Sequence, residues 1–522
     1  MPVWAQLKKM IKSFILALIW VSVAACNDGH PVSQENRMLR YDIPAPVGSL
    51  NPFDGKNSGA TYIHPFLFSY LCVPDETGDL KPDLAVSWNY DPSEFKWTIE
   101  IRKNARFHDG TPVTAQDVKF SVQSSFAGPR KCCENPIKKT DILSSTRINI
   151  SLNKNDPEFL NKIWDMSIAP EHKAGSGDFS NHPIGSGPFK FKSRRGDQSV
   201  ELVANDDYYA GKTLLEGVAF FYQEDKEKSW TRLLAGETDI AHEITPKNYQ
   251  MMADTKNRFH FNTYTLPWYS ILLYNTNDPL FSDARVRQAL THAINRPGIV
   301  ETLLNGYGKA AVGPMGIDNV YSDPKLTPLP YDPQKALDLL RDAGWFLDKN
   351  RQYLEKDGKP FEFTILCFKE GFVPIQAARS IVLDLNEVGI KAHIKLLPFE
   401  ELTGKYQGNN QFQAVLTEFG TSQRKPEEFE KLWTPLIDNV SIAGCFEDAD
   451  VTRLVRLLTA ENDPEKAKAI CHQIDARIAF LQPGTFLYHK TVFDVMSARI
   501  SLPGPFSLTQ GGASRLWRAT IR

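Results

Sequence analysis

The alternation of apolar and polar residues between positions 361 and 397 predicts a strand, a helix and a second strand. Residues 361–367 alternate between apolar and polar side chains, which is the period of a half-buried strand. Residues 378–385 repeat with the period of a helix, Gly389 ends that helix, and residues 390–396 alternate again. A unit of this kind has a right-handed crossover and parallel strands. The pattern therefore predicts an α/β domain.

Helix boundaries are marked by residues that cap or interrupt helices. Asp332 is placed to cap a helix that begins with Pro333 and is closed by Gly344. Residues of the same kinds predict the boundaries of three more helices: one after Ser282, one from about Pro297 to Asn305-Gly306, and one from Asp463-Pro464 to Pro483-Gly484. The N-terminal half is predicted to contain short strands, such as 95–101 and 189–192, and fewer helices. An α/β organisation with at least two lobes follows.

The first 25 residues are typical of a secretory signal peptide. Three lysines precede an apolar run from Phe14 to Ala25, which is too short to span a membrane. The run ends in Val23-Ala24-Ala25-Cys26, which resembles a bacterial lipobox and implies that Cys26 is lipidated. The alternative is an ordinary signal peptide in which Cys26 is incidental. We expect a periplasmic or cell-surface protein anchored to a bacterial membrane by lipid, with residues 1–25 removed.

The charge and cysteine content of the chain restrict the partners and the disulfides to be expected. Removing residues 1–25 leaves 57 basic residues against 62 acidic ones, scattered along the chain, so a nucleic-acid partner is not expected. The length predicts two or more domains. Six further cysteines lie in a chain expected to be exported, where disulfides are plausible, and we expect one to involve Cys132 or Cys133.

Four separated blocks carry a resemblance to a known family. They are residues 84–118, with the run Phe107-His108-Asp109-Gly110-Thr111-Pro112; residues 183–189 with 205–209 and 234–240; Asn275 with Val286-Arg287-Gln288-Ala289-Leu290; and residues 331–345. These blocks resemble the family 5 extracellular solute-binding proteins, the oligopeptide, dipeptide and nickel binders of ATP-driven importers. Their order covers nearly the whole mature chain.

The motifs themselves predict structure rather than chemistry. Thr114 and Asp117 form a capping-box pattern, and His108-Asp109-Gly110 is typical of a turn. Gly185-Ser186-Gly187-Pro188 is not a phosphate loop, because Pro188 lacks a backbone donor and no Lys-Ser/Thr pair follows. We predict that it is a turn between strands.

The resemblance implies an α/β, two-lobed periplasmic-binding-protein clamshell of the class II type. Lobe I would comprise residues 26–62, 185–262 and 490–522, with a subdomain inserted at 63–184, and lobe II would comprise 263–489. Two strands near 262–270 and 488–492 would act as hinges, and the ligand would bind where the lobes close. Trp268 and Tyr269 lie beside the first hinge, where they would line the site or pack in the core of lobe II.

The family's peptide-binding pattern is altered in this chain. In peptide-binding relatives an aspartate just after a tryptophan holds the ligand's α-ammonium group. Aligning Lys425-Pro426 with the family's usual Asp-Pro places Phe419 at the tryptophan and Ser422 at the aspartate, with Glu418 as the nearby acid. Glu418 would take over the amine, or the ligand lacks one, or Glu418 is a solvated charge at a strand end.

The chain offers no catalytic or metal-binding motif. His242-Glu243 has Pro246 where a zincin needs its second histidine, and no G-x-S-x-G elbow occurs. We therefore expect no catalytic residues, no metal site and no cofactor. The expected protein is a monomer that binds a peptide or another small molecule and delivers it to an ABC permease complex. The alternatives are a binder of a metal chelate or other small polar solute, and a ligand sensor without transport.

Overall fold

The structure is a computed structural model that describes most of the chain. The described residues are 37–54, 59–75, 79–127, 135–175, 177–252, 257–317, 319–349, 352–369, 371–408, 410–420, 429, 432–435, 444–461, 463–504 and 516–521. The predicted signal peptide, Cys26, Cys132, Cys133 and Ser422 lie outside them. Within the described residues, no helix combines the length and the apolar character that a membrane span requires.

The chain divides into two compact units. Unit 1 comprises Met1–Asp225, Arg232–Ile240 and Ser497–Arg522, and unit 2 comprises Lys226–Thr231 and Ala241–Met496. The helix α6 (Lys226–Leu234) contributes residues to both. The lobe boundaries expected at 262/263 and 489/490 fall inside unit 2 and remain predictions.

Unit 1 contains a mixed sheet. Strand β1 (Met38–Ile43) pairs in parallel with β10 (Gly217–Tyr222) and, through Tyr41 and Ile240, with β11 (Ile240–Ala241). The antiparallel strands β9 (Ser199–Ala204) and β8 (Phe189–Arg195) extend the sheet beyond β10. The helix α2 (Ala60–Leu67) packs against this sheet through Phe66, whose ring contacts Phe189 and Phe220.

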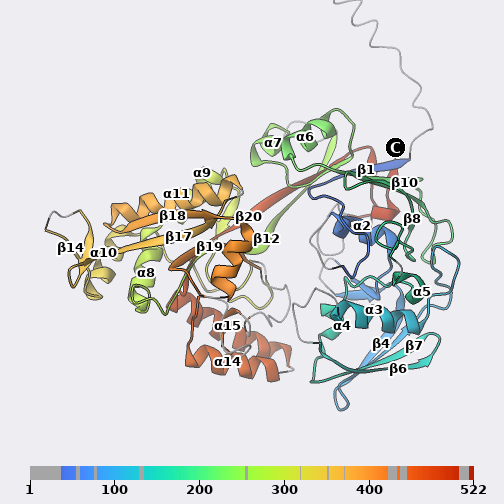
Figure 1. Ribbon diagram of the computed structural model, residues 1–522, viewed down its shortest axis with the longest axis horizontal. Coiled ribbons are helices and arrows are strands. Elements are labelled where there is room, and N and C mark those ends of the chain that lie inside the picture. The colour runs from blue at the N-terminus through green and yellow to red at the C-terminus, as the bar shows by residue number, and fades with distance from the viewer. Residues whose placement is uncertain are drawn as a thin grey trace, which may run out of the picture. The chain divides into compact units, whose positions relative to one another are not determined.

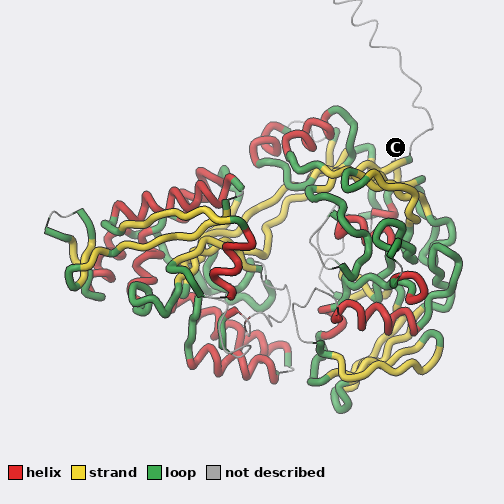
Figure 2. Tube along the Cα trace, viewed as in Figure 1, coloured by secondary structure: helices red, strands yellow, loops and turns green. Residues whose placement is uncertain are grey.

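A second, antiparallel sheet of unit 1 lies within the stretch expected to be the inserted subdomain. Its strand order is β4 (Ala85–Asp91), β5 (Lys96–Ile101), β7 (Arg147–Leu152) and β6 (Ile137–Ser144). Every second residue of β5 and β7 is buried, and these side chains form a core with α3 (Ala115–Ala127), which lies along the strands in Figure 2. The shorter elements are β2 (Cys72–Pro74), β3 (Leu80–Pro82), α4 (Phe159–Lys162), α5 (Glu171–Ala174), β21 (Ile500–Ser501) and β22 (Thr520–Ile521).

The predicted strand–helix–strand unit is present in unit 2. Strands β17 (Glu362–Phe368) and β18 (Lys391–Leu397) pair in parallel and are joined by α11 (Phe372–Glu387), as Figure 1 shows. The sheet continues through β19 (Ala414–Phe419) and β12 (Phe259–Tyr274) to β20 (Gly484–Ser497), which also pairs with β13 (Gly308–Ala310). The prediction of an α/β domain is therefore confirmed.

Alternate residues of the central strands face two different cores. Leu272 and Ile365 belong to a core shared with α8 (Ala284–Ala293), α10 (Pro333–Asp342) and α11. Ile271 and Leu366 belong to a core shared with α12 (Phe399–Thr403), α14 (Ala449–Ala460) and α15 (Pro464–Leu481). The sheet is thus covered on both faces, which explains why its strands are so apolar. The remaining elements of unit 2 are α7 (Pro246–Met251), α9 (Arg296–Leu303), β14 (Phe346–Leu347), β15 (Leu354–Lys356), β16 (Lys359–Pro360) and the π-helix η2 (Gly404–Gly408).

The predicted aspartate caps of α10 and α15 are confirmed by hydrogen bonds, whereas α8 is capped by Asp283 and not by Ser282. The Asp332 carboxylate accepts from the Lys335 backbone N–H, and the Asp463 carboxylate accepts from those of Glu465 and Lys466. At Thr114 the Asp117 carboxylate accepts from both the backbone N–H and the hydroxyl of the threonine. The acidic half of the predicted capping box is therefore formed, while the threonine hydroxyl donates instead of accepting.

Candidate functional site

Strands β12 and β19 of unit 2 bring four of the five predicted ligand residues together. They pair antiparallel with Tyr269 opposite Phe419 and Ser270 opposite Glu418. Trp268 precedes Tyr269 on β12. The pairing of β12 with β19 thus places residues about 150 positions apart in sequence on neighbouring strands of one sheet. The fifth predicted residue, Ser422, is outside the described residues. We refer to Trp268, Ser270, Glu418 and Tyr488 as the β12–β19 site.

Trp268 presents its indole ring at the surface of unit 2. Its side chain is 57% exposed, so the ring is accessible to solvent. A Cβ atom at Gly420 would lie 3.1 Å from the Nε1 and Cε2 atoms of the Trp268 indole. Because glycine has no side chain, there is room for the indole ring at this place. The Trp268 carbonyl oxygen is 3.1 Å from the ring Nδ1 of His489, which holds the main chain in place.

Tyr269 and Phe419 are packing residues rather than surface residues. Tyr269 is fully buried and Phe419 is 6% exposed, and their rings contact each other edge to face. They share a core with Trp433 and Phe486. Tyr269 thus packs in a core of unit 2, which was one of the two positions expected for it. The Phe419 ring lies in the same core.

Glu418 is an exposed carboxylate with one oxygen already engaged. The Ser270 hydroxyl donates to Glu418 Oε1 at 3.2 Å. The neighbouring Tyr488 hydroxyl is buried, and burial raises its pKa to about 12, with a hydrogen bond to Ser270 opposing the rise and the Glu418 charge adding to it. Because the Ser270 and Tyr488 hydroxyls are buried, the exposed Glu418 carboxylate is the group that can bind a cationic donor such as an ammonium group.

Sequence reasoning did not identify Ser270, Gly420 or Tyr488. Ser270 becomes relevant only through the register that places it opposite Glu418, and Tyr488 lies on β20, which neighbours β12. The alternation of side chains along β12 could have suggested that Trp268 and Ser270 share a face. Nothing in the sequence gives the register of β12 against β19.

The His242-Glu243 pair takes part in ion pairs within unit 2. Glu243 is bound by Lys226 at 2.6 Å and Lys490 at 3.5 Å. Burial acts to raise the pKa of Glu243, but the two lysine charges outweigh it and lower the pKa to about 2. His242 Nδ1 lies 3.0 Å from the buried Asp494 carboxylate. The contacts of this pair join segments that are distant in sequence.

Within the described ranges, no three or more His, Cys, Asp or Glu side chains are grouped so that they could hold a metal ion. Cys367 and Cys445 are buried free thiols, so the six cysteines after Cys26 do not form three disulfides. Burial raises the pKa of the Cys367 thiol to about 11, which keeps it protonated and unreactive.

Comparison with known proteins identifies the class to which this two-unit α/β chain belongs. The family of bacterial extracellular solute-binding proteins, family 5, matches residues 79–435. The chain belongs to this family, which is one of solute-binding proteins and not of enzymes, and the resemblance stated from the motifs is confirmed.

Two relatives illustrate the family. The oligopeptide-binding protein AppA of Bacillus subtilis is 28% identical over 466 residues, covering 85% of each chain. Its structure in complex with a nonapeptide superposes with a TM-score of 0.76 at 26% identity, over 93% of this chain and 98% of that one. NikZ from Campylobacter jejuni in complex with Ni(L-His) has a TM-score of 0.77 at 23% identity, over 93% and 99%. The comparison with NikZ supports the fold alone.

Proposed function

We propose that this protein is the substrate-binding component of an ABC importer and is not an enzyme. It captures a peptide or peptide-like solute outside the cytoplasm by closure of its lobes and delivers the solute to the permease. The observation that carries the proposal is the similarity to the oligopeptide-binding protein AppA over 85% of both chains. The geometry of the β12–β19 site supports it independently, because an exposed carboxylate and an exposed indole suit an amine and an apolar side chain.

Glu418 is the proposed contact for the ligand's α-ammonium group. Ser270 occupies Oε1, which orients the carboxylate and leaves Oε2 for the ligand. An ammonium–carboxylate hydrogen bond is roughly twice as strong as one between neutral groups. Trp268, with its exposed ring, is proposed to pack on the peptide, and Tyr269 and Phe419 support the strands from below.

Isothermal titration calorimetry against mixed di- to pentapeptides tests the proposal. We expect Glu418→Gln to weaken the binding of a peptide with a free amine by about tenfold or more, since a charge-assisted bond contributes about 1.5–3 kcal/mol. The same peptide with its α-amine replaced by hydrogen should bind the wild type and the variant equally. Glu465→Gln, which changes an exposed carboxylate on α15, is the matched control and should leave affinity unchanged.

The alternative ligand is a metal chelate or another small polar solute. The NikZ relative carries Ni(L-His), so nickel mixed with L-histidine is the probe for this alternative. If no peptide gives heat and the nickel–histidine mixture does, the ligand is a metal chelate and not a peptide. Adjacent reading frames for an ATPase and permeases would separate transport from sensing without transport.

The lipid anchor is a separate part of the proposal. Cys26 follows small residues at the end of the signal peptide and is proposed to be acylated and to anchor a monomeric protein to a bacterial membrane, in the periplasm or at the cell surface. Cys26→Ala should move the protein from the membrane fraction to the soluble fraction when cells are fractionated without detergent. A variant that still sediments with membranes would refute acylation at Cys26.

A further inference from the structure

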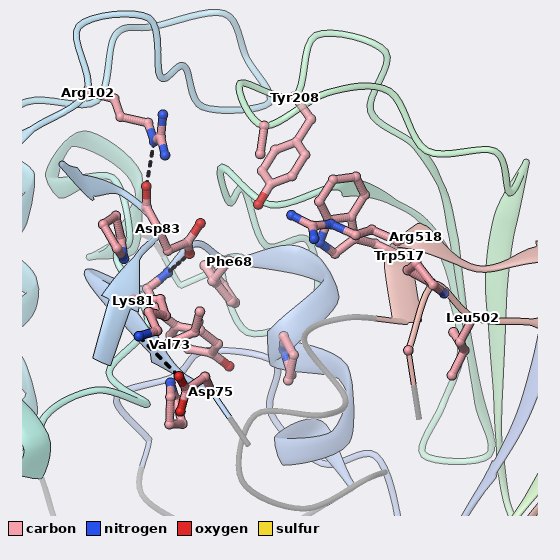
Figure 3. A pocket seen from close by; sticks show the side chains of 17 residues that line it. Phe68, Val73, Asp75, Lys81, Asp83, Arg102, Tyr208, Leu502, Trp517 and Arg518 are labelled. Atoms are coloured by element: carbon pink, nitrogen blue, oxygen red, sulfur yellow. Dashed lines mark hydrogen bonds and ion pairs between the residues drawn. The ribbon is translucent and has the colours of Figure 1, made fainter. Parts of the chain in front are cut away.

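A cavity of about 400 Å³ lies within unit 1, whereas the β12–β19 site belongs to unit 2. Figure 3 shows the side chains that surround it. They come from segments far apart in sequence: the end of α2 and the residues after it, the β2–β3 hairpin, the end of β5, the loop after β9, and the C-terminal segment. Nothing in the proposed capture of a peptide uses this cavity.

The charges around the cavity favour an anion. Its three cationic side chains are Lys81, Arg102 and Arg518, against the two carboxylates Asp75 and Asp83. Lys81 Nζ lies 3.1 Å from the Asp75 carboxylate, so these two charges offset each other.

The Asp83 carboxylate makes no hydrogen bond to Arg102 or Arg518. Its two carboxylate oxygens accept from the Tyr70 backbone N–H at 3.1 Å and from the Tyr209 hydroxyl at 2.7 Å. Burial raises the pKa of Asp83, and the hydrogen bonds from Tyr209 and Tyr70 and the charges of Arg102 and Arg518 oppose this rise. Arg102 donates from Nε to the carbonyl oxygen of Asp83, not to its carboxylate.

Both arginines keep donors for a ligand. The two terminal nitrogens of Arg102 make no hydrogen bond to a described residue, and Arg518 makes neither a hydrogen bond nor a salt bridge within the same part of the chain. Arg518 instead lies over the Trp517 ring, with its guanidinium carbon 4.9 Å from the ring centroid. A guanidinium held on an aromatic face retains its in-plane N–H donors.

Aromatic rings form the apolar part of the wall. Trp517 and Tyr208 contact each other edge to face at 5.2 Å, and Phe68 lies on the far side of the cavity. The Tyr208 hydroxyl points into the space between Asp83 and Arg518 in Figure 3. Burial raises the pKa of Tyr208 well above its usual range, so this hydroxyl remains a hydrogen-bond donor.

We propose that this cavity is a second binding site, for a small aromatic carboxylic acid. The carboxylate is held by Arg102 and Arg518, and the ring lies against Trp517 and Tyr208. A guanidinium fork matches a carboxylate in geometry and charge, which distinguishes the acid from its neutral amide.

Calorimetric titration of the mature chain with phenylacetate and with phenylacetamide tests this proposal. The two probes have the same shape and differ in charge. Phenylacetate should bind with one-to-one stoichiometry and at least tenfold more tightly than the amide. Arg518→Gln should weaken phenylacetate binding by about tenfold, since it removes a charged donor from an exposed position without disturbing the core.

Arg195→Gln is the matched control, because Arg195 is an exposed arginine on β8 of the same unit. It should leave phenylacetate affinity unchanged, and circular dichroism should show both variants to be folded. Absence of phenylacetate binding, equal affinity for acid and amide, or an unchanged affinity in Arg518→Gln would overturn the proposal. Competition between phenylacetate and a peptide bound at the β12–β19 site would also overturn it, because the two sites would not be separate.

Discussion

His108 shows how one side chain of a family motif acts in the fold. Its Nδ1 accepts from the Gly185 backbone N–H at 3.1 Å, and its Nε2 lies 3.1 Å from the Gly187 carbonyl oxygen. The ring is therefore neutral with its proton on Nε2. Burial lowers the pKa of His108 to about 4, with the hydrogen bond to Gly187 opposing the change.

Acid should weaken unit 1 through this histidine. An unfolded histidine titrates near 6.5, so between pH 6.5 and about 4 the unfolded chain binds more protons than the folded chain, and stability falls as pH falls. The difference corresponds to about 3 kcal/mol at most. His108→Gln keeps one donor and one acceptor and should show a smaller loss of urea stability between pH 7 and pH 4. His182→Gln, at an exposed histidine, is the control, and equal pH dependence of wild type and His108→Gln would contradict the assignment.

At the residue scale, the sequence identified some members of the β12–β19 site and not others. Trp268 was predicted because it is an aromatic residue near a crossing between lobes, and Glu418 because it is the acid nearest to the family's aspartate position. The sequence gives no comparable reason to predict Ser270 or Tyr488. Their relevance depends on hydrogen-bonded register and on burial, which are set by tertiary packing and not by local sequence.

At the element scale, the loop Gly185-Ser186-Gly187-Pro188 is not the turn between two strands that was predicted, because it leads from the region after α5 into β8. A Cβ atom at Gly185 would lie 1.8 Å from the carbonyl oxygen of Leu67, at the end of α2. The Ser186 hydroxyl bonds to that of Ser69, and the Asn205 side chain donates to the Gly187 carbonyl oxygen. The glycines thus allow the loop backbone to lie directly against the helix end.

Gly185→Ala should therefore be strongly destabilising. The methyl group would collide with backbone atoms that cannot rotate away, and we expect a loss of about 3 kcal/mol or more in the free energy of unfolding, measured by urea denaturation. Gly175→Ala is the matched control, since a Cβ atom there would have no neighbour within 4 Å and φ is −85°. It should change stability by less than about 0.5 kcal/mol. Similar values for the two variants would contradict the close approach.

Elements were predictable where the information is local. The β17–α11–β18 unit follows from periodicity, and α10 and α15 follow from an aspartate-proline start. The length of β12, with 16 residues, was not predictable, because the polar and apolar residues in its first half follow no single period. The close approach of residues 185–187 to α2 was also not predictable, because a glycine pattern does not show what packs against it.

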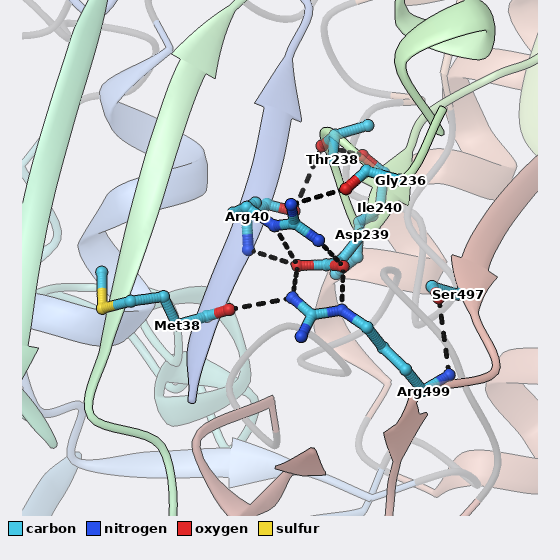
Figure 4. A network of polar contacts seen from close by, with 8 residues as sticks. All are labelled: Met38, Arg40, Gly236, Thr238, Asp239, Ile240, Ser497 and Arg499. Carbon is cyan, nitrogen blue, oxygen red and sulfur yellow. Dashed lines mark hydrogen bonds and ion pairs between the residues drawn. The ribbon is translucent and has the colours of Figure 1, made fainter. Parts of the chain in front are cut away.

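At the scale of the whole molecule, Asp239 ties together the segments of unit 1 from which the chain passes into unit 2. Figure 4 shows its buried carboxylate between the guanidinium groups of Arg40 and Arg499. Its carbonyl oxygen also accepts from the Ser497 backbone N–H at 2.8 Å. Besides the short excursion of residues 226–231, the chain leaves unit 1 after Ile240 and re-enters it at Ser497, and Asp239 binds both of these ends.

The last prediction is that ligand binding closes the lobes. Strands β12 and β20 contain the predicted hinge segments 262–270 and 488–492, and small changes in φ and ψ along such connections rotate whole lobes. A ligand that contacts both lobes stabilises the closed form, because only that form makes all of its contacts. We expect solution X-ray scattering to show a smaller radius of gyration when the protein is saturated with a peptide verified by calorimetry.

The control for this contraction is Glu418→Gln at the same peptide concentration. If it no longer binds the peptide, it should keep the radius of gyration of the free protein, since a ligand shifts the equilibrium only by its difference in affinity for the two forms. Contraction in this non-binding variant would show that the smaller radius of gyration does not depend on peptide binding at Glu418. An unchanged radius in the saturated wild type would mean that this protein binds its ligand without closing, and an importer would then have to recognise something other than the closed shape.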